Sequence, residues 1–521
     1  MRTIPILFLI LVLIPTSIVQ GETNQILLFG GNGEEGSHST GATQDSKGDV
    51  FLYGVTDSTN LPVSPNAFDQ SHNGAFDLFV AKYSHDLSTL LACTYFGGNG
   101  DEISGALVIG PDDHVYIAGV TASSNLPVTE NAFDGSLGGA PDMFVARLSN
   151  DLSQLEALTY IGGRSRETAA RAFLSIDDQG YLYLTGYTES SDFPTTENAY
   201  DTSYNGRGDS FLVKLDADLN VVASTYVGGS ANDWAYVVAN KDGLVYITGH
   251  TESADHPVTD GCYDDTYNSG VDVFVTCLSH DLSTLESSTY IGGSLFDNTS
   301  TMAIDEEGRV WIAGHTESRN YPTSSEAYSD TYGGGGRDVF ISCLDPHLST
   351  LISSTYIGGN QNDYQPFLAY GDGSVWVSGS TLSNDFPVTS DAAQTRYSGS
   401  VDYWLSELTS DLATLRYSTY LGGSGEDWFG IIWWTQDGLL VTGNTDSKDF
   451  MGMDAPVDDF DVFLFRFDKG AEWQIIDEET PVIEEEESIE NGIPGFPFAA
   501  LLLGVAILTY LRLSTRCVKP N

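Results

Sequence analysis

The segment Thr289-Tyr290-Ile291-Gly292-Gly293, with Asp297 four residues later, decides the fold, because the chain repeats it seven times. The Gly pairs recur every 64 to 67 residues, as Gly30-Gly31, Gly97-Gly98, Gly162-Gly163, Gly228-Gly229, Gly292-Gly293, Gly358-Gly359 and Gly422-Gly423. Each pair is followed by an acid, which gives a first ring of carboxylates: Glu35, Glu102, Glu167, Asp233, Asp297, Asp363 and Asp427. A constant period of this length indicates one supersecondary unit repeated along the chain.

Each unit contains four short segments that have the composition of β-strands. In the fifth copy they are residues 301–305, 310–314, 338–344 and 354–357, which are rich in Val, Ile, Tyr and Phe and are bounded by Gly, Asp or Asn. No stretch of the repeats has a sustained helical apolar period. The sequence therefore predicts an all-β fold, a seven-bladed β-propeller over residues 22–470 with four antiparallel strands in each blade.

The two ends of the repeat array predict that the ring is closed. The seventh copy has three strands and stops at residues 461–467, whereas residues 26–29 supply an isolated strand before the first Gly pair. The N-terminal strand is expected to complete the last blade as its outer strand, which removes open sheet edges.

The repeat also resembles a known family. The copies share the pattern Gly-Gly-x-x-x-Asp, Ala-x-Asp-x-x-Gly, Val-Tyr-Ile-x-Gly-x-Thr, Asp-Phe-Pro-Val-Thr, Asp-x-Phe-Val-x-x-Leu and Ser-Thr-Tyr-Ile-Gly-Gly over residues 26–467. This pattern resembles the SBBP-type β-propeller repeat of bacterial and archaeal secreted proteins. The seventh copy departs from it, with Asp449-Phe450-Met451-Gly452 in place of the Phe-Pro-Val-Thr segment. The resemblance implies an architecture and a surface location, and it implies no catalytic residues.

The two ends of the chain predict export and attachment to a membrane. Residues 1–21 have the composition of a secretory signal peptide. Residues 493–511 carry no charge over 19 residues and are long enough to span a bilayer. Because Arg512, Arg516 and Lys519 follow, we expect residues 512–521 to form a short cytoplasmic tail and the propeller to lie outside the cell.

An acidic segment, residues 471–492, separates the propeller from this apolar stretch and is predicted to be an extended spacer. Together with the sequence Ile493-Pro494-Gly495-Phe496-Pro497, the apolar stretch and its basic end resemble a PGF-type sorting signal of archaeal surface proteins. That resemblance implies that an archaeosortase-like enzyme replaces the segment with a lipid anchor. Pro497 stands where the family has Gly, and a plain transmembrane anchor is the alternative.

The charge of the chain excludes several kinds of partner. The 21 Lys and Arg residues against 73 Asp and Glu residues give a formal net charge of −52. Nucleic acids and anionic lipid surfaces are poor partners, because binding phosphate needs clustered cationic side chains. Surroundings rich in salt or in calcium both fit this charge.

The five cysteines do not form a disulfide framework. We expect Cys93, Cys277 and Cys343 to be packed as free thiols, and Cys517 falls in the predicted tail. A bridge between Cys262 and Cys277 is the alternative for that pair.

A second ring of carboxylates opens the third strand of every unit: Asp77, Asp142, Asp209, Asp272, Asp338, Asp402 and Asp461. In a propeller these residues share one face with the Gly-Gly turns and the long loops, and loops are where binding usually occurs. Each blade could pair one acid from each ring with loop carbonyls to hold Ca²⁺, which takes six to eight oxygen ligands. The alternative is that the carboxylates accept backbone N–H bonds and hold the loops in place.

Residues that break the repeat are the other candidates for ligand binding. Arg164, Arg166 and Arg171 form the densest basic cluster of the propeller and could bind a carboxylate or a uronic acid. Pairing with acids of neighbouring blades is the alternative.

Aromatic residues directly follow the first-ring acid in three blades, as Trp234, Tyr364 and Trp428. They could stack on a sugar, or they could pack between blades. His250 and His315 occupy equivalent positions in adjacent units, and two His residues without a third ligand are a weak indication of a metal site.

No motif for nucleophilic, zinc-dependent or nucleotide-dependent catalysis occurs in the chain. We therefore expect a non-enzymatic, membrane-anchored surface protein, with no cofactor beyond structural Ca²⁺, whose propeller acts as a scaffold or adhesion module. The alternatives are a receptor domain that binds a glycan or Ca²⁺, and a glycan-active enzyme with a carboxylate pair.

Overall fold

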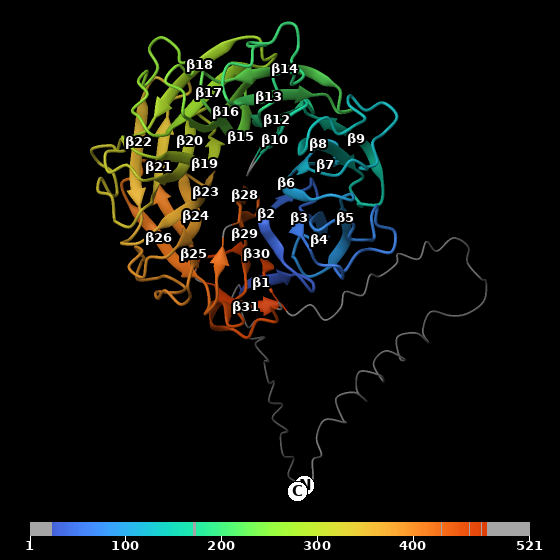
Figure 1. The fold of residues 1–521 in the computed structure, drawn as a ribbon. Helices are drawn as coiled ribbons and strands as arrows, with labels where there is room; N and C mark the ends of the chain where they lie inside the picture. The colour runs from blue at the N-terminus through green and yellow to red at the C-terminus, as the bar shows by residue number, and fades with distance from the viewer. Residues whose placement is uncertain (1–22, 170–172, 429, 458, 470, 477–521) are drawn as a thin grey trace, which may run out of the picture. The chain divides into compact units, whose positions relative to one another are not determined.

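The computed structural model describes residues 23–476 except 170–172, 429, 458 and 470. In this part of the chain seven β-sheets are arranged around a common centre (Figure 1). The predicted all-β, seven-bladed propeller with four antiparallel strands in each blade is confirmed.

Five blades are four-stranded sheets whose strands follow one another in chain order. Blade one contains β2 (Glu35–Gln44), β3 (Val50–Thr56), β4 (Asp77–Tyr83) and β5 (Leu90–Phe96). Blade two contains β6 (Glu102–Ile109), β7 (Val115–Thr121), β8 (Asp142–Leu148) and β9 (Leu155–Ile161). Blade four contains β15 (Asp233–Lys241), β16 (Leu244–Thr251), β17 (Asp272–Ser279) and β18 (Leu285–Ile291). Blade five contains β19 (Asp297–Ile304), β20 (Val310–Thr316), β21 (Asp338–Leu344) and β22 (Leu351–Ile357). Blade six contains β23 (Asp363–Gly371), β24 (Ser374–Thr381), β25 (Asp402–Thr409) and β26 (Leu415–Leu421).

Blades three and seven have a divided first strand. Blade three contains β10 (Glu167–Thr168), β11 (Leu174–Ile176), β12 (Leu182–Thr188), β13 (Asp209–Leu215) and β14 (Val221–Val227). Blade seven contains β27 (Asp427–Trp428), β28 (Ile432–Thr435), β29 (Gly438–Thr445) and β30 (Asp461–Phe467), with a short 3₁₀ helix at Phe450–Gly452. Two further strands complete it: β1 (Thr23–Phe29) and β31 (Glu472–Ile476).

The ring is closed between the two ends of the propeller. Strand β1 pairs antiparallel with β30 and places Leu27 opposite Leu464. Strand β31 pairs parallel with the other edge of β1, so the prediction that the N-terminal strand is the outer strand is wrong. Apolar packing explains why β31 joins the sheet: Trp473 lies edge-on to Phe465, at 5.1 Å between ring centres. The acidic composition of this segment predicts instead that it belongs to the spacer.

The core lies between the blades. Strands β3, β7 and β12 are buried at every residue, because each second strand is covered on both faces by neighbouring blades. The first strand of each blade lies nearest the centre (Figure 1). It begins at the Gly-Gly turns and ends at the short turn that leads to the second strand.

Several predictions fall outside the described residues: the signal peptide at 1–21, most of the spacer, the apolar stretch at 493–511, the tail at 512–521, Arg171 and Cys517. Within the described part of the chain, no helix has the length and apolar character needed to cross a membrane. Cys93, Cys277 and Cys343 are buried, as predicted, and Cys262 and Cys277 are free thiols, so the alternative Cys262–Cys277 bridge is not formed.

Candidate functional site

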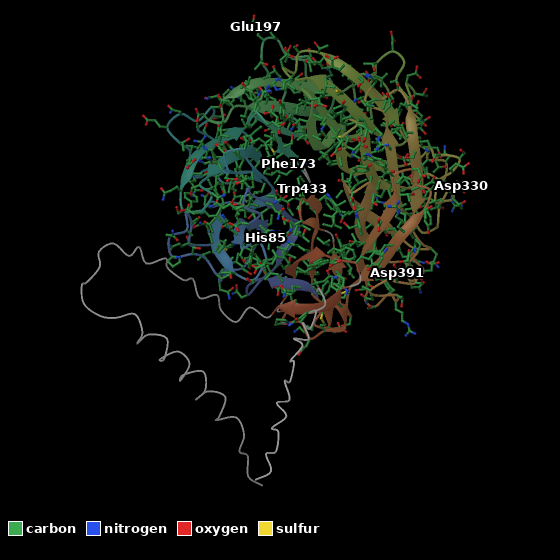
Figure 2. The ribbon with its side chains drawn as sticks, turned by 180° about the vertical axis from the view of Figure 1, so that it is seen from behind. His85, Phe173, Glu197, Asp330, Asp391 and Trp433 are labelled. Carbon is green, nitrogen blue, oxygen red and sulfur yellow. The ribbon has the colours of Figure 1, made fainter. Side chains whose placement is uncertain are left out.

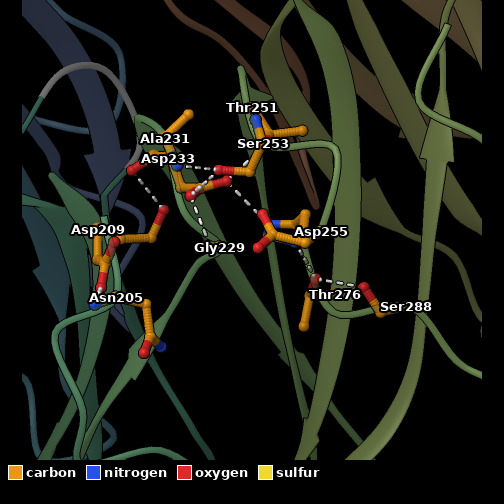
Figure 3. A network of polar contacts seen from close by, with 12 residues as sticks. Asn205, Asp209, Gly229, Ala231, Asp233, Thr251, Ser253, Asp255, Thr276 and Ser288 are labelled. Atoms are coloured by element: carbon orange, nitrogen blue, oxygen red, sulfur yellow. Dashed lines mark hydrogen bonds and ion pairs between the residues drawn. The ribbon is translucent and has the colours of Figure 1, made fainter. Parts of the chain in front are cut away.

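The first-ring acids are buried and hydrogen-bonded in the same way in all seven blades. In blade four, Asp233 accepts hydrogen bonds from the Gly229 N–H at 2.7 Å, from the Thr251 hydroxyl, and from the Ser253 hydroxyl at 2.8 Å (Figure 3). In every blade the acid accepts a bond from the N–H of the second Gly and from a Thr hydroxyl. The carboxylate therefore holds the Gly-Gly turn against the end of the second strand.

The second-ring acids hold the long loops. Asp209, for example, accepts the N–H of Asn205 at 2.8 Å, four residues earlier in the loop. Loop N–H donors bind the acid in the same way in five other blades, at Asp77, Asp142, Asp272, Asp338 and Asp402. The geometry of both rings thus supports the role of carboxylates that tie loops.

The second-ring acid of one blade faces the first-ring acid of the next blade across the first Gly of the pair, so the acids pair between blades and not within one blade as the sequence predicted. A Cβ atom added to Gly228 would lie 3.0 Å from an oxygen of both Asp209 and Asp233. The same crowding by both carboxylates occurs at the first Gly of the other six pairs, at Gly30, Gly97, Gly162, Gly292, Gly358 and Gly422. Glycine is required there because the two carboxylates occupy the space of a side chain.

Burial raises the pKa of many of these facing carboxyl groups above the values of exposed acids. Burial raises the pKa of Glu35, Glu102 and Glu167 to about 7. In Asp209, Asp272 and Asp338 the Oδ1 atom is buried and has no hydrogen-bond donor among the described residues. A proton held between the two carboxyl groups satisfies such a pair.

In blade four a histidine side chain lies beside the first-ring acid. His256 Nδ1 lies 2.9 Å from Asp233 Oδ1, and both side chains are fully buried. Although burial raises it, the hydrogen bond and the charge of His256 hold the pKa of Asp233 below its usual value. On its other side His256 Nε2 lies 3.4 Å from Thr276 Oγ1. The order Asp–His–Thr is that of a nucleophilic triad, but the exposures of 0%, 2% and 0% leave no access for a substrate.

A titration decides whether Ca²⁺ occupies the paired acids. No group of three or more His, Cys, Asp or Glu side chains among the described residues is arranged to hold a metal ion. We expect CaCl₂ added to EDTA-treated propeller to raise the Tm no more than NaCl at the same ionic strength. A ligand at a hundredfold excess over its Kd stabilises by about 2.7 kcal/mol. A steep rise at millimolar CaCl₂ alone would assign the pairs to Ca²⁺.

The predicted basic cluster is only partly assembled. The Arg164 side chain is 88% exposed, and its Nε lies 3.5 Å from Asp192. The guanidinium of Arg166 lies 6.0 Å from the centre of the Trp234 ring, while Arg171 is outside the described residues. At the Gly-Gly face Arg166 thus lies near Trp234, whereas Arg164 lies near Asp192.

The three predicted aromatic residues pack between blades. Trp234 stacks on Tyr187 of the preceding blade at 3.8 Å, and Tyr364 stacks on Trp428 at 6.0 Å. All three are half-buried, and none lines the cavities described below. His250 and His315 both pack near the Phe296 ring, at 6.0 Å and 5.8 Å between ring centres.

The most distinctive cavity is the mouth of the central channel at the face of the short turns. Its volume is about 440 Å³, and each of the seven first strands contributes one residue at the same register: Thr43, Val108, Ser175, Ala239, Ala303, Ala369 and Trp433. Six of these side chains are small. Trp433 is 47% exposed and lies near the centre of the ring in the view from behind (Figure 2).

A second cavity of about 470 Å³ adjoins the mouth and shares Ile304, Tyr370 and Trp434 with it. Its other lining residues include the carboxylates Asp305, Glu306, Glu307 and Asp372, together with Lys241. A third cavity of about 600 Å³ lies elsewhere and is polar, with Arg147 bonded to Glu156 at 3.0 Å inside it. The channel mouth and its neighbour therefore combine an apolar wall, an exposed indole and acceptors of hydrogen bonds, which is typical of a ligand site.

The sequence predicts binding on the Gly-Gly face and does not predict a site at this mouth. A sequence signal for it does exist, because one register position near the end of the first strand carries a small residue in six copies and Trp433 in the seventh. Finding it requires the strand register, which pairs Trp433 with Leu440 as it pairs Ala369 with Trp376.

No family model matches the chain, and no curated protein matches it, so the SBBP and PGF resemblances stay predictions. Solved propellers are similar in fold. A polysaccharide lyase of family PL25, an ulvan lyase, shares 10% identity with a TM-score of 0.44, over 87% of this chain and 96% of its own. The β-propeller domain of the Trilobed protease from Pyrococcus furiosus shares 10% identity with a TM-score of 0.40, over 86% and 98%. The endosialidase of phage phi92 shares 8% identity with a TM-score of 0.42, over 91% and 71%.

These neighbours contradict the expectation that the chain is not an enzyme, since they include propellers that are a polysaccharide lyase and an endosialidase. The expectation relied on the absence of contiguous catalytic motifs. A propeller can assemble a site from single residues of several blades, as the channel mouth shows, and no contiguous motif records such a site. At 8% to 10% identity the likeness transfers neither a residue nor a reaction.

Proposed function

We propose that the chain is a secreted, surface-attached propeller that binds a glycan at the channel mouth of the short-turn face. The observation that carries the proposal is Trp433, a half-exposed indole that stands alone in a ring of six small residues. A large aromatic side chain that remains exposed in a cavity does not stabilise the fold by burial, and contact with a ligand explains its presence.

The chemistry of the mouth supports a sugar as the ligand. A sugar ring has an apolar C–H face, which packs on an aromatic plane, and hydroxyl groups, which donate to carboxylates. Trp433 supplies the plane, and Glu306 and Asp372 in the adjoining cavity supply exposed acceptors. The cavities also have volumes in the range of small-ligand sites.

The surface attachment in this proposal is supported by the sequence alone. The signal peptide at 1–21 and the apolar stretch at 493–511 would place the propeller outside the membrane, with an archaeosortase-like enzyme as a processing partner. A scaffold or adhesion role then consists of holding the cell to a glycan through the mouth.

Replacement of Trp433 by alanine tests the glycan site. We expect the Trp433→Ala variant to lose at least about 30-fold in affinity for a glycan found by array screening, because an aromatic anchor in a binding pocket contributes 2 kcal/mol or more. Titration calorimetry measures the loss, and product analysis of the same mixtures reports any cleavage of the glycan.

The matched control is Phe133→Ala, which removes another aromatic side chain of 46% exposure from a surface loop. It should leave affinity unchanged. Equal affinity of wild type and Trp433→Ala, or equal losses in the two variants, would refute binding at the channel mouth.

A further inference from the structure

The rim of the channel mouth is a ring of carboxylates. The seven turns between first and second strands, residues 45–49, 110–114, 177–181, 241–244, 305–309, 371–374 and 435–438, carry twelve Asp and Glu residues and three Lys and Arg residues. Every turn contributes at least one acid. The apolar well around Trp433 is thus surrounded by negative charge from all seven blades.

Part of this charge is not compensated within the protein. Asp305 is bonded to Arg309 at 2.6 Å, and Asp45 to Lys82 at 3.0 Å. In contrast, Asp178, Asp242, Glu306 and Asp372 are exposed and have no ion-pair partner among the described residues. Charges of one sign around a recessed site concentrate the field at its mouth and attract ligands of the opposite sign.

We infer that the glycan bound at this mouth carries free, protonated amino groups. The inference rests on the proposed function and names the class of its ligand. An indole next to carboxylates fits an amino sugar: the ring packs on Trp433, and the ammonium group lies toward Glu306 and Asp372 in the adjoining cavity. An ammonium group near an aromatic face also gains a cation–π attraction.

The same charges exclude an anionic glycan from this mouth. A uronic acid or a sulfated sugar would meet the carboxylate rim, and like charges at close range are repelled. The exposed cations Arg164 and Arg166 lie at the Gly-Gly face, which is the opposite end of the first strands.

The test compares two hexasaccharides that differ only in charge: a fully N-acetylated glucosamine hexamer and its fully deacetylated form, at pH 6. We expect the deacetylated hexamer to bind at least about tenfold more tightly at 50 mM NaCl, with a smaller ratio at 300 mM because salt screens the rim. The double variant Glu306→Gln/Asp372→Asn should lower this ratio, and Trp433→Ala should weaken both ligands.

The matched control is Glu197→Gln/Asp330→Asn, which changes net charge equally at two exposed loop residues (Figure 2). It should leave the ratio unchanged. Equal or tighter binding of the acetylated hexamer would overturn the inference and leave the proposed function in place. Binding of neither hexamer, together with no hit on the glycan array, would overturn both. A lysine hexapeptide that bound as tightly, with the same loss in Trp433→Ala, would overturn the assignment to a sugar.

Discussion

Removal of strand β1 is expected to lower the Tm of the propeller by about 10 °C or more. In a chain of residues 22–476, deletion of 23–31 leaves β30 and β31 without the strand that joins them. It also removes Ile26, Leu27, Leu28 and Phe29, all of them buried. Each large apolar side chain of this kind contributes about 1.5–3 kcal/mol by burial, and the loss removes the strand that closes the last blade beside the first.

A point variant keeps this prediction testable if the deleted chain does not fold. Phe29 stacks on Phe79 of blade one at 4.9 Å, so a single side chain of β1 connects the last blade to the first. Phe29→Ala should cost about 3–5 kcal/mol, measured by urea unfolding, whereas Phe133→Ala on an exposed loop should cost little. Unchanged unfolding of Phe29→Ala would show that closure by β1 does not stabilise the ring.

The architecture was predictable because every copy of the repeat contains the residues that specify it. The Gly pairs, the acids after them and the three-stranded last copy predict seven blades and a closing strand, and all are present. Features that occur once were not predictable in this way. Strand β31, which contains Trp473, adds to the last blade although it lies in an acidic segment. The apolar contacts of this one strand stabilise the pairing despite the acidic residues around it.

The candidate site also depends on features that occur only once in the sequence, in this case single residues. Trp433 and Trp434 are neighbours in sequence, yet Trp433 is 47% exposed at the channel mouth while the Trp434 ring covers Gly371 so closely that a Cβ there would lie 2.0 Å from it. The pleat of β28 sends the two side chains to opposite faces. Which of them remains exposed in the channel mouth depends on register with β29, and the repeat pattern does not contain that register.

The aromatic residues that the sequence predicted as ligand contacts pack between blades instead. Trp234 follows a conspicuous repeated acid, but its position places it against Tyr187 of the preceding blade. An aromatic residue next to a repeated motif therefore packs between blades. The exposed indole of Trp433, by contrast, lies outside the repeated motifs.

The second large effect concerns pH. We expect the free energy of unfolding to be greater at pH 5 than at pH 8, by on the order of several kcal/mol, measured by urea unfolding in 1 M NaCl. The high salt screens the general repulsion of the −52 charge but affects buried pairs much less. The effect arises from the facing carboxyl groups of the seven blades.

The direction follows from the pKa values. Burial raises the pKa of Asp209, Asp272, Asp338 and Asp427 to about 7, and that of Asp402 to about 6, from 3.8. An acid whose folded pKa is raised contributes stability that is fully present below its unfolded pKa and is lost as the pH rises through the folded value. The loss therefore falls between about pH 4 and pH 7, and each unit of pKa difference corresponds to about 1.4 kcal/mol.

Blade four provides a contrast within the same molecule. Since His256 holds the pKa of Asp233 below its usual value, Asp233 contributes stability above its unfolded pKa and loses it only as the pH falls through its folded value. That loss lies below pH 4, outside the window. The pH dependence between 5 and 8 is thus expected from the other pairs and from Asp209.

The variant Asp338→Asn isolates one pair. Its carboxamide can keep the oxygen that accepts the Gly333 N–H and can direct its NH₂ group toward Asp363, where the Asp338 Oδ1 atom has no donor. We expect this variant to be more stable than wild type at pH 8, to gain little at pH 5, and to have a pH slope smaller by up to about 1.4 kcal/mol per unit.

The exposed variant Asp330→Asn is the control and should keep the wild-type slope. If the wild-type stability did not change between pH 5 and pH 8, or if Asp338→Asn kept the full slope, the pairs would not share a proton. The seven Gly pairs link this chemistry to the fold: a Cβ at Gly358 would lie 2.9 Å from both Asp338 and Asp363, so the glycine that creates the repeat also brings the two acids together. Because such a pair lies at each junction between neighbouring blades, and burial raises the pKa in the pairs named above, we expect the propeller to be most stable in mildly acidic surroundings.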